Sequence, residues 1–134
     1  MKFQAVVLFM ALSSFPCLAQ NSEKYRACNE KAKTQAEMST CANEEATRVD
    51  DRMNDVYRKL LSKAAREPEA VAKIKRAETA WVAYRDAFIN AMYPAKDKQA
   101  AYGSIYPMEV DLLGAKLTQQ HISALMELLQ QYGD

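Results

Sequence analysis

Residues 28–41 read CNEKAKTQAEMSTC, and this stretch decides the fold. Its composition is typical of a helix, yet a cysteine stands at each end. A single straight helix would separate Cys28 from Cys41 by about 20 Å. A disulfide requires Cα atoms within roughly 7 Å of each other. Either both thiols are free, or the chain reverses direction between the two cysteines.

The N-terminal segment bears on this choice because it resembles a secretory signal. Lys2 provides a minimal positive region, and residues 5–12 form an apolar core that is too short to span a bilayer. Cys17-Leu18-Ala19 then offers small residues for cleavage before Gln20. We therefore expect residues 1–19 to be a cleaved signal peptide and the protein to be periplasmic or secreted, where disulfides persist.

Two other interpretations of this segment are less favoured. Cys17 could carry a lipoprotein anchor, but a small residue normally precedes such a cysteine, and here Pro16 does. A retained transmembrane helix is less favoured still. No second apolar run is long enough to span a bilayer, so we expect a single domain over residues 20–134, without membrane insertion after signal cleavage.

A helix start signal supports reversal of the chain. Thr34-Gln35-Ala36-Glu37 matches a capping box, with Thr34 at the N-cap and Glu37 three residues later. A helix that begins there requires a break just before it. The sequence therefore predicts a helical hairpin closed by a Cys28–Cys41 disulfide, which contributes roughly 3 kcal/mol by loop entropy.

Charge and composition exclude some classes of protein. Removal of residues 1–19 takes away Lys2 and no acidic residue, so 17 basic and 17 acidic residues remain and the net charge is zero. This balance argues against a general nucleic-acid or anionic-membrane binder, which would be basic. Only 3 glycines occur, and Ala, Glu, Lys, Leu and Met are abundant, as is typical of all-helical domains.

Apolar spacing and proline positions predict four helices. The apolar residues recur three and four apart, and Pro68, Pro94 and Pro107 mark boundaries. The expected helices span residues 22–33, 35–66, 68–92 and 107–132. The predicted fold is all-α: the disulfide-closed N-terminal hairpin plus two further antiparallel helices, in a small four-helix arrangement.

Chemistry that would support catalysis is scarce. His121 is the only histidine, with no obvious serine or acidic partner at helical spacing, and we interpret it as a solvated or interface side chain. No Cys/His cluster for a metal and no glycine-rich phosphate loop is present, so no cofactor is expected. We predict that the protein is not an enzyme. A small hydrolase that depends on His121 is the least favoured hypothesis.

Polar residues interrupt the apolar pattern of the two long helices in the middle of the chain. Arg85 lies on the apolar face of its helix, one turn after Trp81. A buried guanidinium must be paired, because leaving it unpaired costs several kcal/mol. Asp50, Asn54 and Glu78 are the candidate partners. The favoured interpretation is a polar network between helices, and the alternative is a partner-binding or ligand site. The candidate residues of this polar core are Asp50, Asn54, Tyr57, Trp81, Arg85 and Asp86.

The long connection over residues 95–106 is a second candidate site, because loops of this length in compact domains are often functional. It has room for a helical turn. The residues that could contact a partner are Lys96, Lys98, Tyr102, Gly103, Ser104 and Tyr106. The alternative is a turn in which Ile105 and Tyr106 cover the helix ends.

Five motifs resemble a known family in the same order and at similar intervals. They are Cys28 and Cys41 with Thr34-Gln35-Ala36-Glu37-Met38 between them, Asp50-x-x-Met53-Asn54-x-x-Tyr57, Trp81-x-x-Tyr84-Arg85-Asp86, Gly103-Ser104-Ile105-Tyr106-Pro107-Met108, and Leu117-Thr118. The chain resembles the lysozyme inhibitor LprI-like N-terminal domain family from about Tyr25 to Leu128.

Four positions depart from the family pattern. The pattern has cysteines where this chain has Ile89 and Leu113, so we expect an apolar contact in place of a second disulfide. It has glutamine at the position of Glu78 and arginine at that of His121. Any function tied to those two side chains in the family is therefore in doubt here.

The resemblance implies a secreted or periplasmic binding protein that acts on a lysozyme or other peptidoglycan hydrolase. Lysozyme clefts are lined by two carboxylates, and a basic, hydroxyl-bearing loop such as Lys96–Tyr106 could block one. Alternatively, acidic residues of the helix over 35–66 could meet a cationic lysozyme surface. A non-catalytic envelope adaptor or structural protein, which binds another periplasmic protein or a wall fragment, is the competing hypothesis.

Overall fold

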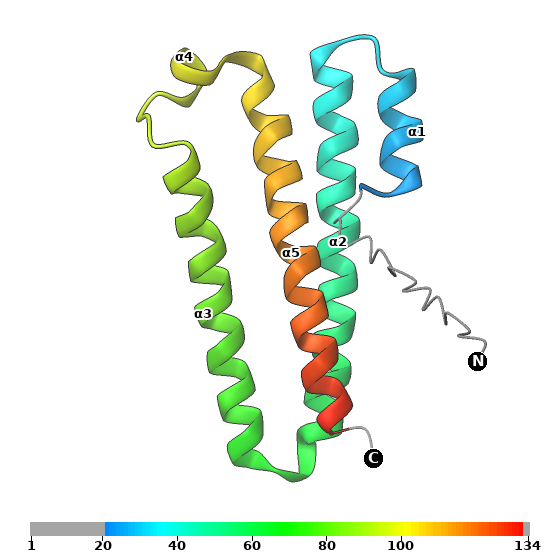
Figure 1. The fold of residues 1–134 in the computed structure, drawn as a ribbon, viewed down its shortest axis with the longest axis vertical. Helices are drawn as coiled ribbons and strands as arrows, with labels where there is room; N and C mark the ends of the chain where they lie inside the picture. Colours follow the sequence, from blue (N-terminus) through cyan, green and yellow to red (C-terminus); the bar gives the residue numbers. More distant parts are fainter. Residues whose placement is uncertain (1–20, 133–134) are drawn as a thin grey trace, which may run out of the picture.

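The computed structural model describes residues 21–132, so the predicted signal peptide lies outside the described residues. The described part is helical and contains no strand (Figure 1). Its elements are α1 (Glu23–Lys31), α2 (Gln35–Lys63), η1 (Ala64–Arg66), α3 (Pro68–Met92), α4 (Lys98–Tyr102), η2 (Gly103–Ile105) and α5 (Tyr106–Gln131). The four predicted helices are confirmed as α1, α2 with η1, α3 and α5. The expected helical turn in the connection is α4.

The helices lie across the molecule in the order α3, α5, α2, α1 (Figure 1). α2 packs mainly against α5, although α3 separates them in the sequence. The two run in the same direction, and α3 returns antiparallel to both. The α1–α2 turn and α4 therefore lie at one end of the molecule, and the α2–α3 turn lies at the other.

The main core lies between α2 and α5 and is closed on one side by α3. Leu60 of α2 and Ile122 of α5 are fully buried, and Ile74 is the buried residue of α3. Complete burial of each such side chain contributes about 2 kcal/mol. The buried residues of this cluster are Met53, Leu60, Ala64, Ile74, Ile122 and Leu125.

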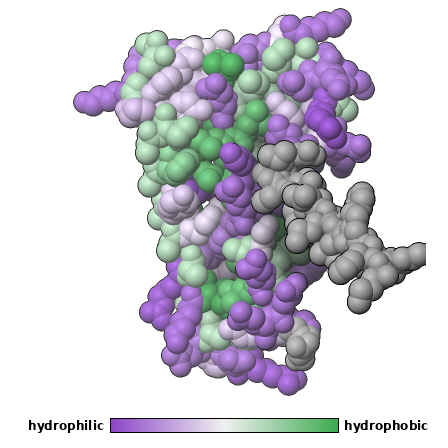
Figure 2. Space-filling model, in the orientation of Figure 1, coloured by the Kyte–Doolittle hydropathy of each residue, from purple (hydrophilic) through white to green (hydrophobic). Residues whose placement is uncertain are grey.

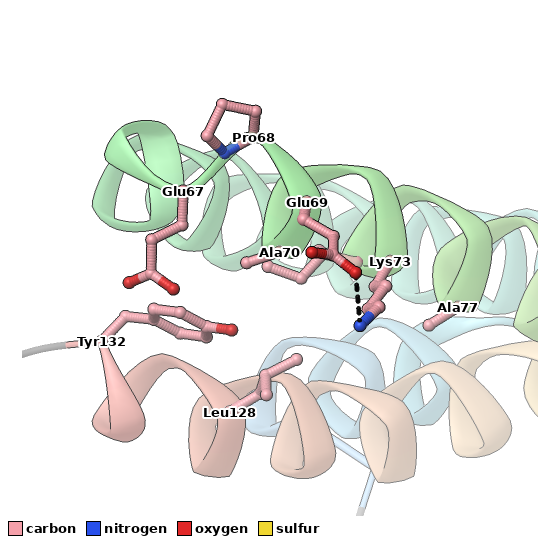
Figure 3. A pocket seen from close by; sticks show the side chains of 9 residues that line it. Glu67, Pro68, Glu69, Ala70, Lys73, Ala77, Leu128 and Tyr132 are labelled. Carbon is pink, nitrogen blue, oxygen red and sulfur yellow. Dashed lines mark ion pairs between the residues drawn. The ribbon is translucent and has the colours of Figure 1, made fainter.

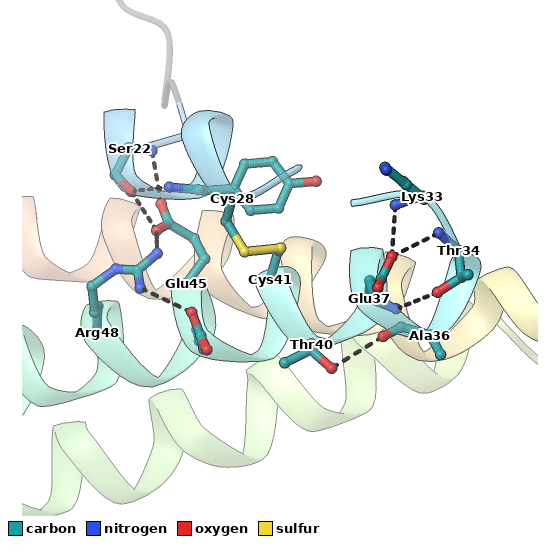
Figure 4. Close-up of a disulfide and its surroundings, with 12 residues drawn as sticks. Ser22, Cys28, Lys33, Thr34, Ala36, Glu37, Thr40, Cys41, Glu45 and Arg48 are labelled. Carbon is teal, nitrogen blue, oxygen red and sulfur yellow. Dashed lines mark hydrogen bonds and ion pairs between the residues drawn. A yellow bond between two sulfur atoms is a disulfide. The ribbon is translucent and has the colours of Figure 1, made fainter. Parts of the chain in front are cut away.

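A second, smaller core forms around the disulfide (Figure 4). The predicted Cys28–Cys41 bond is present, with a Cα–Cα distance of 5.7 Å. Met108 and Leu112 of α5 pack against this buried cluster, which includes Tyr25 and Ala42 beside the disulfide. The N-terminal hairpin thus contacts the first turns of α5 through a cluster separate from the main core.

The capping box that predicted the chain reversal is also confirmed. Thr34 Oγ1 accepts a hydrogen bond from the backbone N–H of Glu37 at 3.2 Å. Glu37 Oε2 in turn accepts from the backbone N–H groups of Thr34 at 3.0 Å and Lys33 at 2.6 Å. These bonds satisfy donors that a helix start leaves without partners, so α2 begins at the residue after Thr34.

A buried carboxylate that the sequence did not reveal ties the start of α1 to α2. Glu45 is 4% exposed and accepts hydrogen bonds from the backbone N–H and the hydroxyl of Ser22, at 2.8 and 2.6 Å (Figure 4). Arg48 Nη2 donates to it at 2.6 Å. Burial acts to raise the pKa of Glu45, but the bonds from Ser22 and Arg48 prevail and its pKa is lowered.

Candidate functional site

Arg85 lies at the centre of a polar cluster between α3, α2 and α5. Its Nη1 lies 3.7 Å from Asp50 Oδ1 of α2, and its Nε lies 3.2 Å from Asp86 Oδ1. The guanidinium carbon also lies 5.1 Å from the centre of the Trp81 ring. Fully buried Thr118 of α5 donates to Asp50 at 3.2 Å. Of the three partners considered for Arg85, Asp50 is therefore the one that the structure brings to it.

The other residues of the predicted polar core are spread more widely. Asn54 and Asp86 are exposed on α2 and α3. Tyr57 is half-buried and packs against the main core, where burial, with a smaller effect of the Glu78 carboxylate, raises its pKa. The Arg85 side chain itself is 22% exposed. The cluster thus joins the helices at the margin of the core and is open to solvent on one side.

Glu78 and His121 form a second polar link between α3 and α5. Glu78 Oε2 lies 2.7 Å from His121 Nε2, and the side chains are only 13% and 12% exposed. The imidazole stacks on Trp81, with ring centres 4.0 Å apart and planes 4° from parallel. His121 is therefore an interface residue with an acidic partner. That partner comes from another helix, so spacing along α5 could not reveal it.

The long connection between α3 and α5 folds into a cap, formed by α4 and η2 and held by three tyrosines. The ring centre of Tyr93 lies 5.3 Å from those of Tyr102 and Tyr106, which are 5.7 Å from each other. Tyr102 Oη accepts the backbone N–H of Ala95 at 3.1 Å, and Lys98 Nζ donates to the backbone oxygen of Tyr93. The side chains of three of the six predicted partner-binding residues therefore also contribute to the structure of the cap: Lys98, Tyr102 and Tyr106.

Other side chains of the cap face solvent. Lys96 and Ser104 are exposed, and Ile105 is 40% exposed although it is apolar. Gly103, which ends α4, has φ of 70°, a conformation that a residue with a Cβ rarely adopts. The glycine thus allows the tight change of direction that places Ser104 and Ile105 at the surface.

Hollows also lie outside this cap. One, of about 650 Å³, lies between the N-terminal part of α3 and the end of α5, and the Glu69–Lys73 pair lies at its margin (Figure 3). A second, of about 300 Å³, lies beside the Cys28–Cys41 disulfide. A third, of about 170 Å³, is lined by Arg85, Asp50, Asp86 and Asp111 among others. Among residues 21–132, no group of three or more His, Cys, Asp or Glu side chains is arranged to hold a metal ion.

A comparison with known protein families matches residues 28–125 to the family described as lysozyme inhibitor LprI. The chain belongs to this family. The match begins at the disulfide cysteine of α1 and ends near the last turns of α5, so it includes the cap and both links to α3. The resemblance seen in the five sequence motifs is thereby confirmed. No protein of curated function and no solved structure matches the chain.

The family is described as one of lysozyme inhibitors, a class of proteins that bind an enzyme. In this chain, no helix of the described part is long and apolar enough to cross a membrane. The polar pairs Arg85–Asp50 and Glu78–His121 link helices to one another, and the cap exposes side chains that a partner could contact.

Proposed function

We propose that this protein binds and inhibits a lysozyme-type cell-wall hydrolase in the periplasm or outside the cell. The family match carries this proposal, because it extends over all the long helices and the cap between α3 and α5. The Cys28–Cys41 disulfide supports the location, since such bonds persist in oxidising compartments.

The cap is the surface that we assign to the hydrolase. The cap lies at one end of the molecule, the same end as the α1–α2 turn (Figure 1). Its backbone is fixed by the tyrosine cluster, so little conformational entropy is lost on binding. The exposed Lys96 provides a cation for a cleft lined by two carboxylates, and Ile105 provides an apolar contact.

The acidic face of α2 is a weaker candidate for the same role. Glu44 lies 4.0 Å from Arg48, and Asp55 pairs with Arg58. These cations on the same helix offset part of the negative charge that would attract a basic hydrolase. The acidic face remains able to steer association, which depends on the summed field more than on single contacts.

The test is the lysis of a peptidoglycan suspension, followed by turbidity with and without the purified, oxidised protein. Slower lysis with at least one class of lysozyme is expected at micromolar protein. Unchanged lysis with every class would contradict the proposal. In that case, capture of another periplasmic protein that is lost in cap variants would favour the envelope-adaptor hypothesis.

A further inference from the structure

Basic residues are concentrated at the end of the molecule opposite the cap. Residues 58–76 carry 7 basic and 2 acidic side chains, a net charge of +5. The whole chain has a net charge of +1, so the remaining residues carry −4. The seven basic residues, all exposed, are Arg58, Lys59, Lys63, Arg66, Lys73, Lys75 and Arg76.

The fold gathers these seven residues around a single turn. α2 ends at Lys63, η1 carries the chain around, and α3 begins at Pro68. At 1.5 Å of rise per residue, each of the seven lies within about 15 Å of the turn along a helix axis. In the view of Figure 1 this end is the lower one, and hydrophilic side chains line the same edge in Figure 2.

Few carboxylates neutralise this basic end. Among the ion pairs of the described residues, two involve members of the group: Arg58 with Asp55, and Lys73 with Glu69. Glu127 is the acidic residue that α5 contributes to its last two turns. The other five basic side chains have no carboxylate within ion-pair distance in the described part of the chain. An excess of positive charge therefore remains.

We propose that this basic end docks on an anionic phospholipid surface. Groups of four to eight Lys and Arg residues bind such surfaces, because each contributes about 1 kcal/mol close to the membrane. The basic side chains are spread around the α2–α3 turn and the adjoining parts of both helices, which suits an array of headgroups better than a single polymer strand. Contact is electrostatic, without insertion. The balanced total charge conceals this site because the excess is local.

Docking by this end would orient the whole molecule. α3 has 25 residues, so it extends about 37 Å from the turn toward the cap. The cap would then face away from the lipid surface. The proposal does not require that the cap bind a hydrolase, although the two are compatible.

The experiment is co-sedimentation of the purified, oxidised protein with phosphatidylcholine vesicles, with and without phosphatidylglycerol. The test variant is Lys63→Glu/Arg66→Glu/Lys75→Glu. The control is Lys24→Glu/Arg26→Glu/Lys31→Glu, which reverses three exposed basic residues of α1 and changes the net charge equally. Circular dichroism checks that both fold.

Binding to phosphatidylglycerol vesicles is expected, with loss on raising the salt concentration. The test variant should lower the partition coefficient by about a hundredfold or more, because each of the three basic residues near the surface strengthens binding about fivefold and each new glutamate is repelled. The control should keep most of the binding. Equal loss in both variants, or binding that does not depend on phosphatidylglycerol, would overturn the proposal. Inhibition of lysozyme is measured without lipid, so its outcome is independent.

Discussion

The contact between the Glu78 and His121 side chains could be recognised only from the fold. The family resemblance marked both positions as departures from its pattern, and Glu78 was considered only as a partner for Arg85. In the structure they lie 2.7 Å apart on different helices, and His121 stacks on the half-buried Trp81. The two positions are therefore in contact, and a change in one side chain alters the partner of the other.

A double-mutant cycle tests this coupling. Glu78→Ala and His121→Ala should each destabilise the protein, and the double variant should be less destabilised than the sum of the two by about 1 kcal/mol. Urea unfolding followed by tryptophan fluorescence gives the free energies, since Trp81 is the only tryptophan and lies against His121. Strict additivity would show that the contact contributes nothing to stability.

Glu45 predicts a specific dependence of stability on pH. Its pKa is lowered in the folded protein, so its contribution is fully present above the pKa of an unfolded glutamate and is lost as the pH falls through the lowered value. Glu45→Gln should therefore cost about 2 kcal/mol near neutral pH and less in acid.

Unfolding curves at several pH values measure this effect. Glu37 will leave some acid dependence in the variant, because hydrogen bonds from Lys33 and Thr34 lower its pKa too. The exposed neighbour Glu44 provides the control, Glu44→Gln, which removes the same charge with little effect on stability. A Glu45→Gln cost that does not change with pH would contradict the assignment.

At the scale of elements, α1 is attached independently of the main core. It is held by the disulfide, by the small cluster around Tyr25 and by the bonds from Ser22 to Glu45. The main cluster draws its buried residues from α2, η1, α3 and α5 instead. Helices α2 and α5 contribute to both cores, but no buried residue belongs to both.

Reduction of Cys28–Cys41 should therefore loosen α1 and leave α2, α3 and α5 packed. The loss is expected to be about 3 kcal/mol within the hairpin, in the chain-entropy account of a loop of this length. Hydrogen exchange should accelerate in α1, while Trp81 fluorescence and most of the helical circular dichroism are retained. A general collapse of helicity on reduction would show that the two cores are not separable.

The same elements show what the sequence could and could not predict. Helix boundaries followed from local signals, such as the capping box at Thr34 and the prolines at 68 and 107, because these act within one turn of the chain. These local signals did not predict which helices pack against each other. α2 packs mainly on α5 and not on α3, which comes next in the sequence. Apolar spacing defines a buried face but not the helix that covers it.

The candidate sites, too, could be predicted only in part from the sequence. Asp50 was among the partners expected for Arg85, since a cation on an apolar face needs a nearby carboxylate. The inward role of Tyr102 and Tyr106 could not be separated from a binding role, because both explain aromatic residues in a long connection. The outward position of Ile105 depends on the backbone around Gly103.

At the scale of the whole molecule, the two ends differ in charge and in shape. The cap is fixed by aromatic contacts and exposes Lys96 and Ile105, whereas the α2–α3 turn exposes a group of basic residues. Because these surfaces lie at opposite ends of the long axis, variants at one end leave the other intact (Figure 1). This separation allows the proposed inhibition and the proposed lipid contact to be tested individually.

The most direct measurement of the central claim is the inhibition constant for peptidoglycan lysis by a lysozyme, determined for the protein and for two matched variants. Ile105→Asp changes an apolar side chain of the cap that is 40% exposed, and Met126→Asp changes one of α5 that is 43% exposed. The account predicts inhibition by the unmodified protein, about tenfold or greater weakening by Ile105→Asp, and little change by Met126→Asp. Inhibition that both variants retain equally would contradict the assignment to the cap, and absence of inhibition by the unmodified protein would contradict the function itself.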